Sequence, residues 1–347
     1  MPPMGLVILA TSWGRDLGPL LLPLVCAGLG ATVLAAVHHA EVVAHRVGEP
    51  FGTLTLAVAV TIIEVALIVT LMLSGGAKAS SLARDTVFAA IMITCNGVVG
   101  LCLLVGTLRH RVVKFRVEGS NGALAAMTAL VTLSLVLPTF TTSTPGPTFS
   151  PLQLAFAGVA SLTMYGVFVF VQTMRHRAYF LPVDTGTIED HAPPPTRLTA
   201  LTSLVLLLVC LVAVVGLAKT VSPSIESAIT AIGAPLSAVG VMIALLVLMP
   251  ETVAAVRAAS RNRLQTSFNL ALGSALASIG LTIPAIAVAS IWLNDPLLLG
   301  LDGKEMVLLA LTVTLNVLTI GTGSATLLQG TVHLIAFSAF LFLAFMP

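Results

Sequence analysis

The chain has 347 residues, of which 57% are hydrophobic and only 9% are charged, and its formal net charge is +2. A soluble domain usually gives about a quarter of its residues to charged side chains, so this composition argues against a protein surrounded by water and indicates one surrounded by membrane lipid. The net charge is small, and the basic residues lie in short loops rather than in a patch, so the sequence does not indicate a nucleic-acid partner.

Ten apolar segments follow one another along the chain. Each approaches the roughly 20 residues that a helix needs to cross the hydrocarbon core of a bilayer. Their apolar runs are continuous rather than alternating, which favours helices over the strands of a membrane barrel. We therefore expect an all-α integral membrane protein with about ten transmembrane helices, at roughly 17–38, 52–74, 86–108, 122–138, 150–174, 199–219, 228–256, 265–292, 304–321 and 324–346.

The longest hydrophilic interruption is residues 175–198, which contain three consecutive prolines. It divides the chain into a first five-helix repeat (1–174), a linker (175–198) and a second five-helix repeat (199–347). Because each half has an odd number of spans, the second half enters the membrane from the opposite side. The predicted architecture is therefore two inverted repeats, a common arrangement in transporters.

The distribution of basic residues predicts the orientation, because cytoplasmic loops of membrane proteins are enriched in Lys and Arg. Eleven of the sixteen basic residues lie in the loops after the first, third, fifth and seventh helices. We expect these loops, including the linker 175–198, to be cytoplasmic and both termini to lie on the outer side. The other five are Arg15, Lys78, Arg84, Lys219 and Lys304.

Glu64 lies about twelve residues into the second predicted helix, which places it roughly 18 Å deep at 1.5 Å per residue. No basic residue lies within a helical turn of it. An acidic residue at the centre of a membrane helix costs about 2.5–3.5 kcal/mol on insertion scales. Its position is most easily explained if the carboxylate faces a cavity, a partner or a transported cation.

Glu251 follows Pro250 inside the seventh apolar segment. Proline removes a backbone donor and disfavours the preceding helical turn, so we expect the helix to bend or break beside this acid and to free carbonyl oxygens that ligate a cation. The alternative is that Glu251 caps the cytoplasmic end of the helix and pairs with Arg257 or Arg261.

The two glutamates occupy corresponding places, each in the second helix of its half. The helix that follows each acid is rich in small and polar residues, with Asn96 in the first half and Ser274 and Ser278 in the second. We predict a metal site formed by Glu64, Glu251, Asn96, Ser274 and Ser278. The alternative for the hydroxyl residues is that they only let helices pack closely.

This set of oxygens suits calcium and protons. Calcium prefers six to eight oxygen ligands, and two carboxylates neutralise its double charge. Two acids close together in a poorly solvated site resist being ionised at once, so protons replace the cation when it leaves. We expect calcium as a transported substrate, exchanged for about two protons, with no cofactor and no enzymatic activity.

Three stretches of the chain resemble the bacterial calcium/proton antiporters of the cation/calcium exchanger superfamily. They are GEPFGTLTLAVAVTIIEVALIV at 48–69, the long block PETVAAVRAASRNRLQTSFNLALGSALASIGLTIPAIAVAS at 250–290, and the closing helix at 327–347. The resemblance implies a sodium/calcium exchanger-like fold, a multi-pass location in the bacterial inner membrane, and ion-binding roles for Glu64 and Glu251. Many relatives carry G-N-A-x-E at these acids, whereas this chain has V-T-I-I-E and L-M-P-E.

Other functions stay open at this point. The same scaffold also serves sodium/proton and potassium/proton exchange in members of this branch. An ion channel or an intramembrane enzyme are alternatives of another class, although the sequence has no H-E-x-x-H, G-x-S-x-G or phosphate-loop motif. His38, His39, Glu41 and His45 form an alternative metal-ligand group, for which an interfacial, solvated position is the simpler interpretation.

Overall fold

The computed structural model describes the chain except residues 1, 16, 19–20, 49–50, 76–79, 182–194, 232, 234, 236, 293–295 and 347. Within the helices, only the backbone is described for residues 51–58, 74–75, 222, 225–226 and 228–230. Most of the predicted linker 175–198, including its acidic residues and the first two of its three consecutive prolines, therefore lies outside the described residues.

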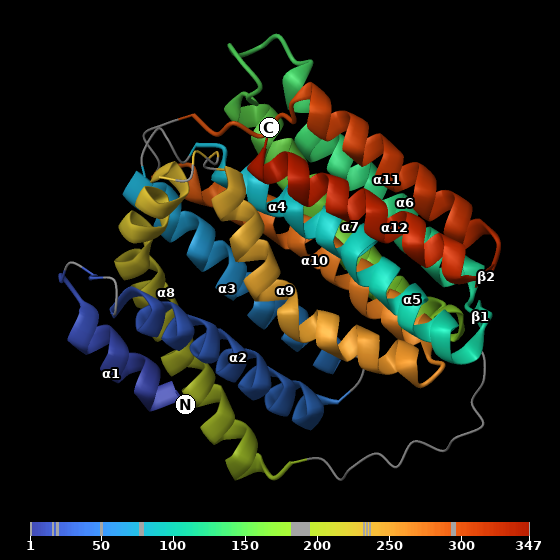
Figure 1. The fold of residues 1–347 in the computed structure, drawn as a ribbon, viewed down its shortest axis with the longest axis horizontal. Helices are drawn as coiled ribbons and strands as arrows, with labels where there is room; N and C mark the ends of the chain where they lie inside the picture. Colours follow the sequence, from blue (N-terminus) through green and yellow to red (C-terminus); the bar gives the residue numbers. More distant parts are fainter. Residues whose placement is uncertain are drawn as a thin grey trace.

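The described chain is almost entirely helical (Figure 1). Its helices are α1 (Pro2–Ser12), α2 (Leu21–Val47), α3 (Phe51–Gly75), α4 (Leu82–Met92), α5 (Val99–His110), α6 (Val117–Val131), α7 (Pro151–Phe170), α8 (Arg197–Ala231), α9 (Ser237–Ser260), α10 (Leu264–Ala289), α11 (Gly303–Gly321) and α12 (Leu327–Phe345). A π-helical segment, η2 (Ile93–Val98), joins α4 to α5 in one continuous span. Shorter π and 3-10 segments extend α6 to Thr139 and α7 to Arg175.

Each of the ten predicted segments corresponds to one long helix or helical span. Among the described residues, nine are long and apolar enough to cross a membrane. The tenth is α3, whose 25 residues include an apolar part at Ala59–Leu73. The chain is therefore a multi-pass membrane protein.

One local boundary was predicted wrongly, and one helix was not predicted. The unpredicted helix is α1, which is short and packs against α2 and α8. The seventh helix begins at Ser237 rather than near 228, because α8 continues to Ala231 through Pro223. Of the bend or break expected at Pro250, the structure shows no break, because α9 runs continuously from Ser237 to Ser260. A proline removes only its own donor, and a membrane helix can continue past it when neighbouring groups compensate.

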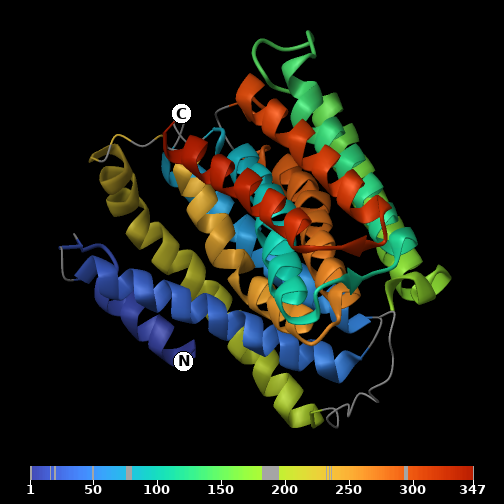
Figure 2. The same ribbon diagram turned by 45° about the vertical axis from the view of Figure 1, so that its right-hand side comes forward.

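The helices of the two halves pack in a reciprocal pattern (Figures 1 and 2). The first long helices of the halves, α2 and α8, pack against each other. The second helix of each half packs against the third helix of the other, as α3 with α10 and α9 with α4. The fifth helix of each half also packs against the third helix of the other half, as α7 with α10 and α12 with α5. This exchange is what two inverted five-helix repeats produce, and it builds one shared centre.

The third helix of each half lies at that centre. The α4–α5 span has 89% of its apolar window buried and α10 has 61%, whereas α12 at the periphery has 22%. A short antiparallel pair, β1 (Val113–Lys114) with β2 (Ser324–Ala325), ties the loop after α5 to the turn between α11 and α12. The acidic and hydroxyl residues of the predicted site are thus carried by the least lipid-exposed helices and their direct neighbours.

Candidate cation-binding site

Glu64 lies near the middle of α3 and is buried, with 2% of its surface exposed. Ser278 of α10 donates a hydrogen bond of 2.8 Å from its Oγ to Glu64 Oε2. The other oxygen, Oε1, accepts no hydrogen bond from the described residues. A buried carboxylate that lacks a counter-charge is costly, so this group must hold either a proton or a cation.

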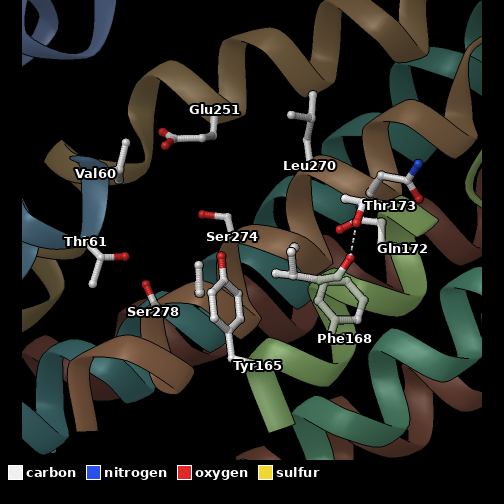
Figure 3. A pocket seen from close by; sticks show the side chains of 14 residues that line it. Val60, Thr61, Tyr165, Phe168, Gln172, Thr173, Glu251, Leu270, Ser274 and Ser278 are labelled. Carbon is white, nitrogen blue, oxygen red and sulfur yellow. Dashed lines mark hydrogen bonds between the residues drawn. The ribbon is translucent and has the colours of Figure 1, made fainter. Parts of the chain in front are cut away.

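Glu251 extends from α9 into a cavity, where Figure 3 shows its carboxylate directed toward α3. Its Oε2 is shielded from solvent and accepts no hydrogen bond from the described residues. Within the described chain neither Arg257 nor Arg261 forms an ion pair with this carboxylate, so the structure gives no support to the capping alternative.

The cavity beside Glu251 has a volume of about 100 Å³ and lies between α3, α7, α9 and α10. It has room for several waters or for a partly hydrated cation, since one water needs roughly 10–15 Å³ of such space. Predicted site residues Ser274 and Ser278 line it together with Glu251. Its other polar lining residues are Thr61, Tyr165, Gln172, Thr173 and Asn269.

Some hydroxyl groups around this cavity have no hydrogen-bond partner among the described residues. Buried threonines elsewhere, such as Thr86 and Thr107, donate to the carbonyl four residues earlier in their own helix. By contrast, Thr61 and Ser274 form no hydrogen bond with the described residues, and both line the cavity. Thr282 Oγ1, one turn beyond Ser278, is buried and also has no partner among them. These oxygens are available to a cation or a water.

Sequence reasoning did not select Thr61, Tyr165 or Thr282 as site residues. Thr61 precedes Glu64 by three residues, so the helical repeat brings its hydroxyl near the same face as the acid. That spacing was the available signal for Thr61. Tyr165 carried no local signal, because it reaches the site only through the packing of α7 on α10.

Asn96, a predicted site residue, forms hydrogen bonds with α11 and α12 rather than with the two glutamates. Its Nδ2 donates to Thr312 Oγ1 at 2.7 Å, and its Oδ1 lies 3.1 Å from His333 Nδ1. Because a carboxamide oxygen only accepts, His333 Nδ1 must donate, and Nε2 faces Thr319 Oγ1 at 3.0 Å. Both polar atoms of Asn96 are thus engaged by α11 and α12, and none of its hydrogen bonds reaches Glu64 or Glu251.

The π-helical segment η2 contributes to this arrangement. The Val99 N–H, which would reach Cys95 O in an α-helix, donates to Thr94 O and Asn96 O instead. The Cys95 carbonyl accepts a hydrogen bond of 3.3 Å from Asn316 Nδ2 on α11. The local change of helical register therefore brings a backbone carbonyl and the Asn96 side chain into one buried polar cluster with α11 and α12.

Among the described residues, no group of three or more His, Cys, Asp or Glu side chains is placed to hold a metal ion. The alternative group of His38, His39, Glu41 and His45 is therefore not assembled as a metal site. His38, Glu41 and His45 are exposed on α2. The cavity at Glu251 is instead lined by one carboxylate and several neutral oxygens.

The sequence profile of the family described as "Sodium/calcium exchanger protein" matches residues 17–174 and 202–346. The "Putative ionic transporter y4hA" of Sinorhizobium fredii is 48% identical over 100% of this chain and 95% of its own length. The "Sodium-potassium/proton antiporter ChaA" of Escherichia coli is 34% identical over 99% of this chain and 94% of its own length.

A solved structure has the same fold. The crystal structure of the H+/Ca2+ exchanger CAX superposes with a TM-score of 0.71 and 16% identity, covering 98% of this chain and 85% of CAX. The helix count, the reciprocal packing of inverted halves and the family profile agree along nearly the whole chain. The chain belongs to the sodium/calcium exchanger protein family.

Proposed function

We propose that this exchanger moves calcium ions against protons, driven by the proton gradient, and that Glu64 and Glu251 hold the two kinds of ion in turn. One observation supports this assignment most directly. Of two acidic side chains from opposite halves, Glu251 lines the cavity and Glu64 accepts a hydrogen bond from Ser278 of the cavity wall, and neither has a basic partner among the described residues. Such a pair needs either a cation or protons.

The proposed ligand set follows from the same geometry. Glu64 and Glu251 supply two negative charges, which match a divalent cation. Thr61, Ser274 and Ser278 supply neutral oxygens from the cavity wall, and waters complete the coordination shell. In this conformation Asn96 belongs to the separate cluster with Thr312 and His333. Its predicted role as a ligand is therefore not part of the proposal for this state.

Coupling follows from electrostatics. Two bare carboxylates cannot pass cheaply through a closed, dehydrated intermediate, whereas a calcium-loaded or a protonated pair can. The empty charged carrier is thus prevented from changing access, and each calcium ion is exchanged for about two protons. A channel would need no such restriction, since its ion flux does not depend on an opposing gradient.

A second candidate is exchange of sodium or potassium for protons at the same site. It is favoured by the 34% identity to a relative from Escherichia coli whose name is sodium-potassium/proton antiporter. A monovalent cation leaves one of the two carboxylates to be neutralised by a proton. The two candidates therefore differ in the number of protons released for each cation.

We further propose that the protein lies in the inner membrane with both termini on the outer side and the linker 175–198 in the cytoplasm. The excess of Lys and Arg in the loops after the first, third, fifth and seventh long helices supports this orientation. In that frame the two halves are 1–174 and 199–347. The cavity beside Glu251 lies toward the cytoplasmic ends of α7 and α10.

The test compares cations as triggers of proton release from everted membrane vesicles that contain the protein. We expect calcium to release protons at a lower concentration than sodium or potassium, with a signal absent from vesicles without the protein. Proton release by sodium or potassium with none by calcium would replace the first candidate by the second. Cation flux that ignores an opposing proton gradient would contradict both.

A further inference from the structure

Tyr165 is a buried tyrosine that brings a hydroxyl group of α7 to the cavity beside Glu251. It is 5% exposed and lines the cavity together with Phe168 and Val169 of the same helix. Of these three residues, it alone has a polar side chain. Helix α7 therefore contributes one hydroxyl group to the cavity wall.

The ring of Tyr165 is held in place by a close approach to Gly280 of α10. A Cβ at Gly280 would lie 2.7 Å from Tyr165 Cβ, 3.1 Å from its Cγ and 3.3 Å from its Cδ2. Gly280 is two residues beyond Ser278, which donates a hydrogen bond to Glu64. Because a tyrosine side chain has only two torsions, this contact also fixes where the hydroxyl group lies.

The hydroxyl group of Tyr165 is directed into the cavity. Figure 3 shows it pointing toward Ser274. The Glu251 carboxylate and the Thr61 hydroxyl group face the same space from the other side of this view. Four oxygen-bearing side chains, from α3, α7, α9 and α10, thus converge on one part of the cavity.

The Tyr165 hydroxyl group forms no hydrogen bond with the described residues. Thr173, also in the cavity wall, donates to Val169 O of the preceding turn at 2.6 Å. A phenolic oxygen stands at the far end of its ring, so Tyr165 cannot satisfy its hydroxyl group on its own helix in this way. Its partner must therefore come from the cavity.

A role in packing alone does not account for this hydroxyl group. A buried hydroxyl group without a partner destabilises the folded protein, and a phenylalanine would fill the same space without that penalty. A cation in the cavity removes the penalty, because hard cations are bound by carboxylates together with neutral oxygens.

We propose that the Tyr165 hydroxyl oxygen is a further ligand of the transported cation, contributed by α7 in addition to the oxygens of α3, α9 and α10. The proposal rests on the exchange function, because it adds a ligand to the site of Glu64 and Glu251. A hydroxyl oxygen can present a lone pair to the cation while its hydrogen is donated to an acceptor, here Ser274 Oγ. This ligand extends the coordination shell without adding a third negative charge.

The test is cation binding by the purified full-length protein in detergent, measured by equilibrium dialysis with calcium, sodium or potassium. Tyr165→Phe removes one oxygen and keeps the ring. Tyr179→Phe is the matched control, because Tyr179 is the other of the two tyrosines, is 41% exposed and stacks on His176. Loss of a group that supports a metal site typically weakens binding by about 10–100-fold. We expect Tyr165→Phe to raise the Kd by about tenfold or more and the control to leave it unchanged.

Thermal unfolding distinguishes a ligand from a residue that only packs. Without a cation we expect Tyr165→Phe to unfold at the same temperature as the unsubstituted chain, because its hydroxyl group has no protein partner to lose. A bound cation stabilises the folded state and raises the unfolding temperature. This rise should be smaller in Tyr165→Phe than in Tyr179→Phe at the same cation concentration.

Two results would overturn the role of Tyr165. One is an equal Kd for Tyr165→Phe and the unsubstituted chain. The other is a lower unfolding temperature of Tyr165→Phe without a cation together with a full cation-induced rise, as a packing role requires. Binding of sodium or potassium but not calcium would contradict calcium as the substrate, while the Kd for the bound cation would still decide the role of Tyr165. Binding of none of the three by the unsubstituted chain would overturn both proposals.

Discussion

Ser278 Oγ donates a hydrogen bond to Glu64 Oε2 across the boundary between the two halves of the protein. The serine is carried by α10, the third long helix of the second half, and the acid by α3, the second long helix of the first. The contact ties the most deeply buried acid of the candidate site to the wall of the cavity that contains Glu251. A substitution of Ser278 therefore tests the proposed cation site.

Replacing Ser278 by Ala should weaken cation binding without abolishing exchange. A hydrogen bond to a charged group contributes about 1.5–3 kcal/mol, so we expect the apparent affinity for calcium to fall by about tenfold or more. The measurement is proton release from everted vesicles over a series of calcium concentrations. Ser338→Ala is the control, because Ser338 is exposed and bonds only to Leu334 O in its own helix. Equal affinities in the two variants would remove Ser278 from the site.

Asn96 and His333 should behave as one structural unit. Their contact is buried, and removal of either partner leaves Asn96 Oδ1 or His333 Nδ1 without its hydrogen bond, which costs about 1–3 kcal/mol. We expect Asn96→Ala and His333→Ala each to lower the temperature of unfolding in detergent, and the double variant to lose less than the sum. Loss of exchange in Asn96→Ala with unchanged thermal stability would instead favour a role for Asn96 as a cation ligand.

Gly240 should resist substitution because α4 and α9 are in close contact there. A Cβ at this position would lie 2.9 Å from Thr86 N and 3.0 Å from Asp85 Cβ. Gly240→Ala must therefore push two helices apart, an overpacking that typically costs about 1–3 kcal/mol. Gly166→Ala is the matched control, since nothing lies within 4 Å of a Cβ there. A thermal unfolding temperature equal in the two variants would contradict the close approach.

The apolar runs predicted the number and order of the long helices, because length and continuous hydrophobicity are direct requirements of a lipid environment. The same signal failed between α8 and α9. Apolar residues continue on both sides of the point where α8 ends at Ala231 and α9 begins at Ser237, so composition alone did not show where one helix ends. At Pro250, where a bend or a break was expected, α9 continues without a break.

The site was predictable to a similar extent. Glu64 and Glu251 stand out because each is an acid inside an apolar helix. Ser274 and Ser278 lie four residues apart, on one face of α10, and both line the cavity. The position of Asn96 was not predictable, because the π-helical segment η2 changes the helical register that sequence spacing assumes. Contacts that depend on such a register change, or on the packing of a third helix as at Tyr165, have no signal in a single sequence.

The most direct test of the account measures calcium-triggered proton release from everted vesicles by Glu64→Gln and Glu251→Gln. Each substitution keeps the shape of the side chain and removes its ability to exchange a proton for a cation. Glu118→Gln is the control, because Glu118 is exposed at the start of α6. We expect both site variants to lose exchange while the control retains it. Full calcium-dependent proton release by either site variant would contradict a mechanism in which the two acids share one cation.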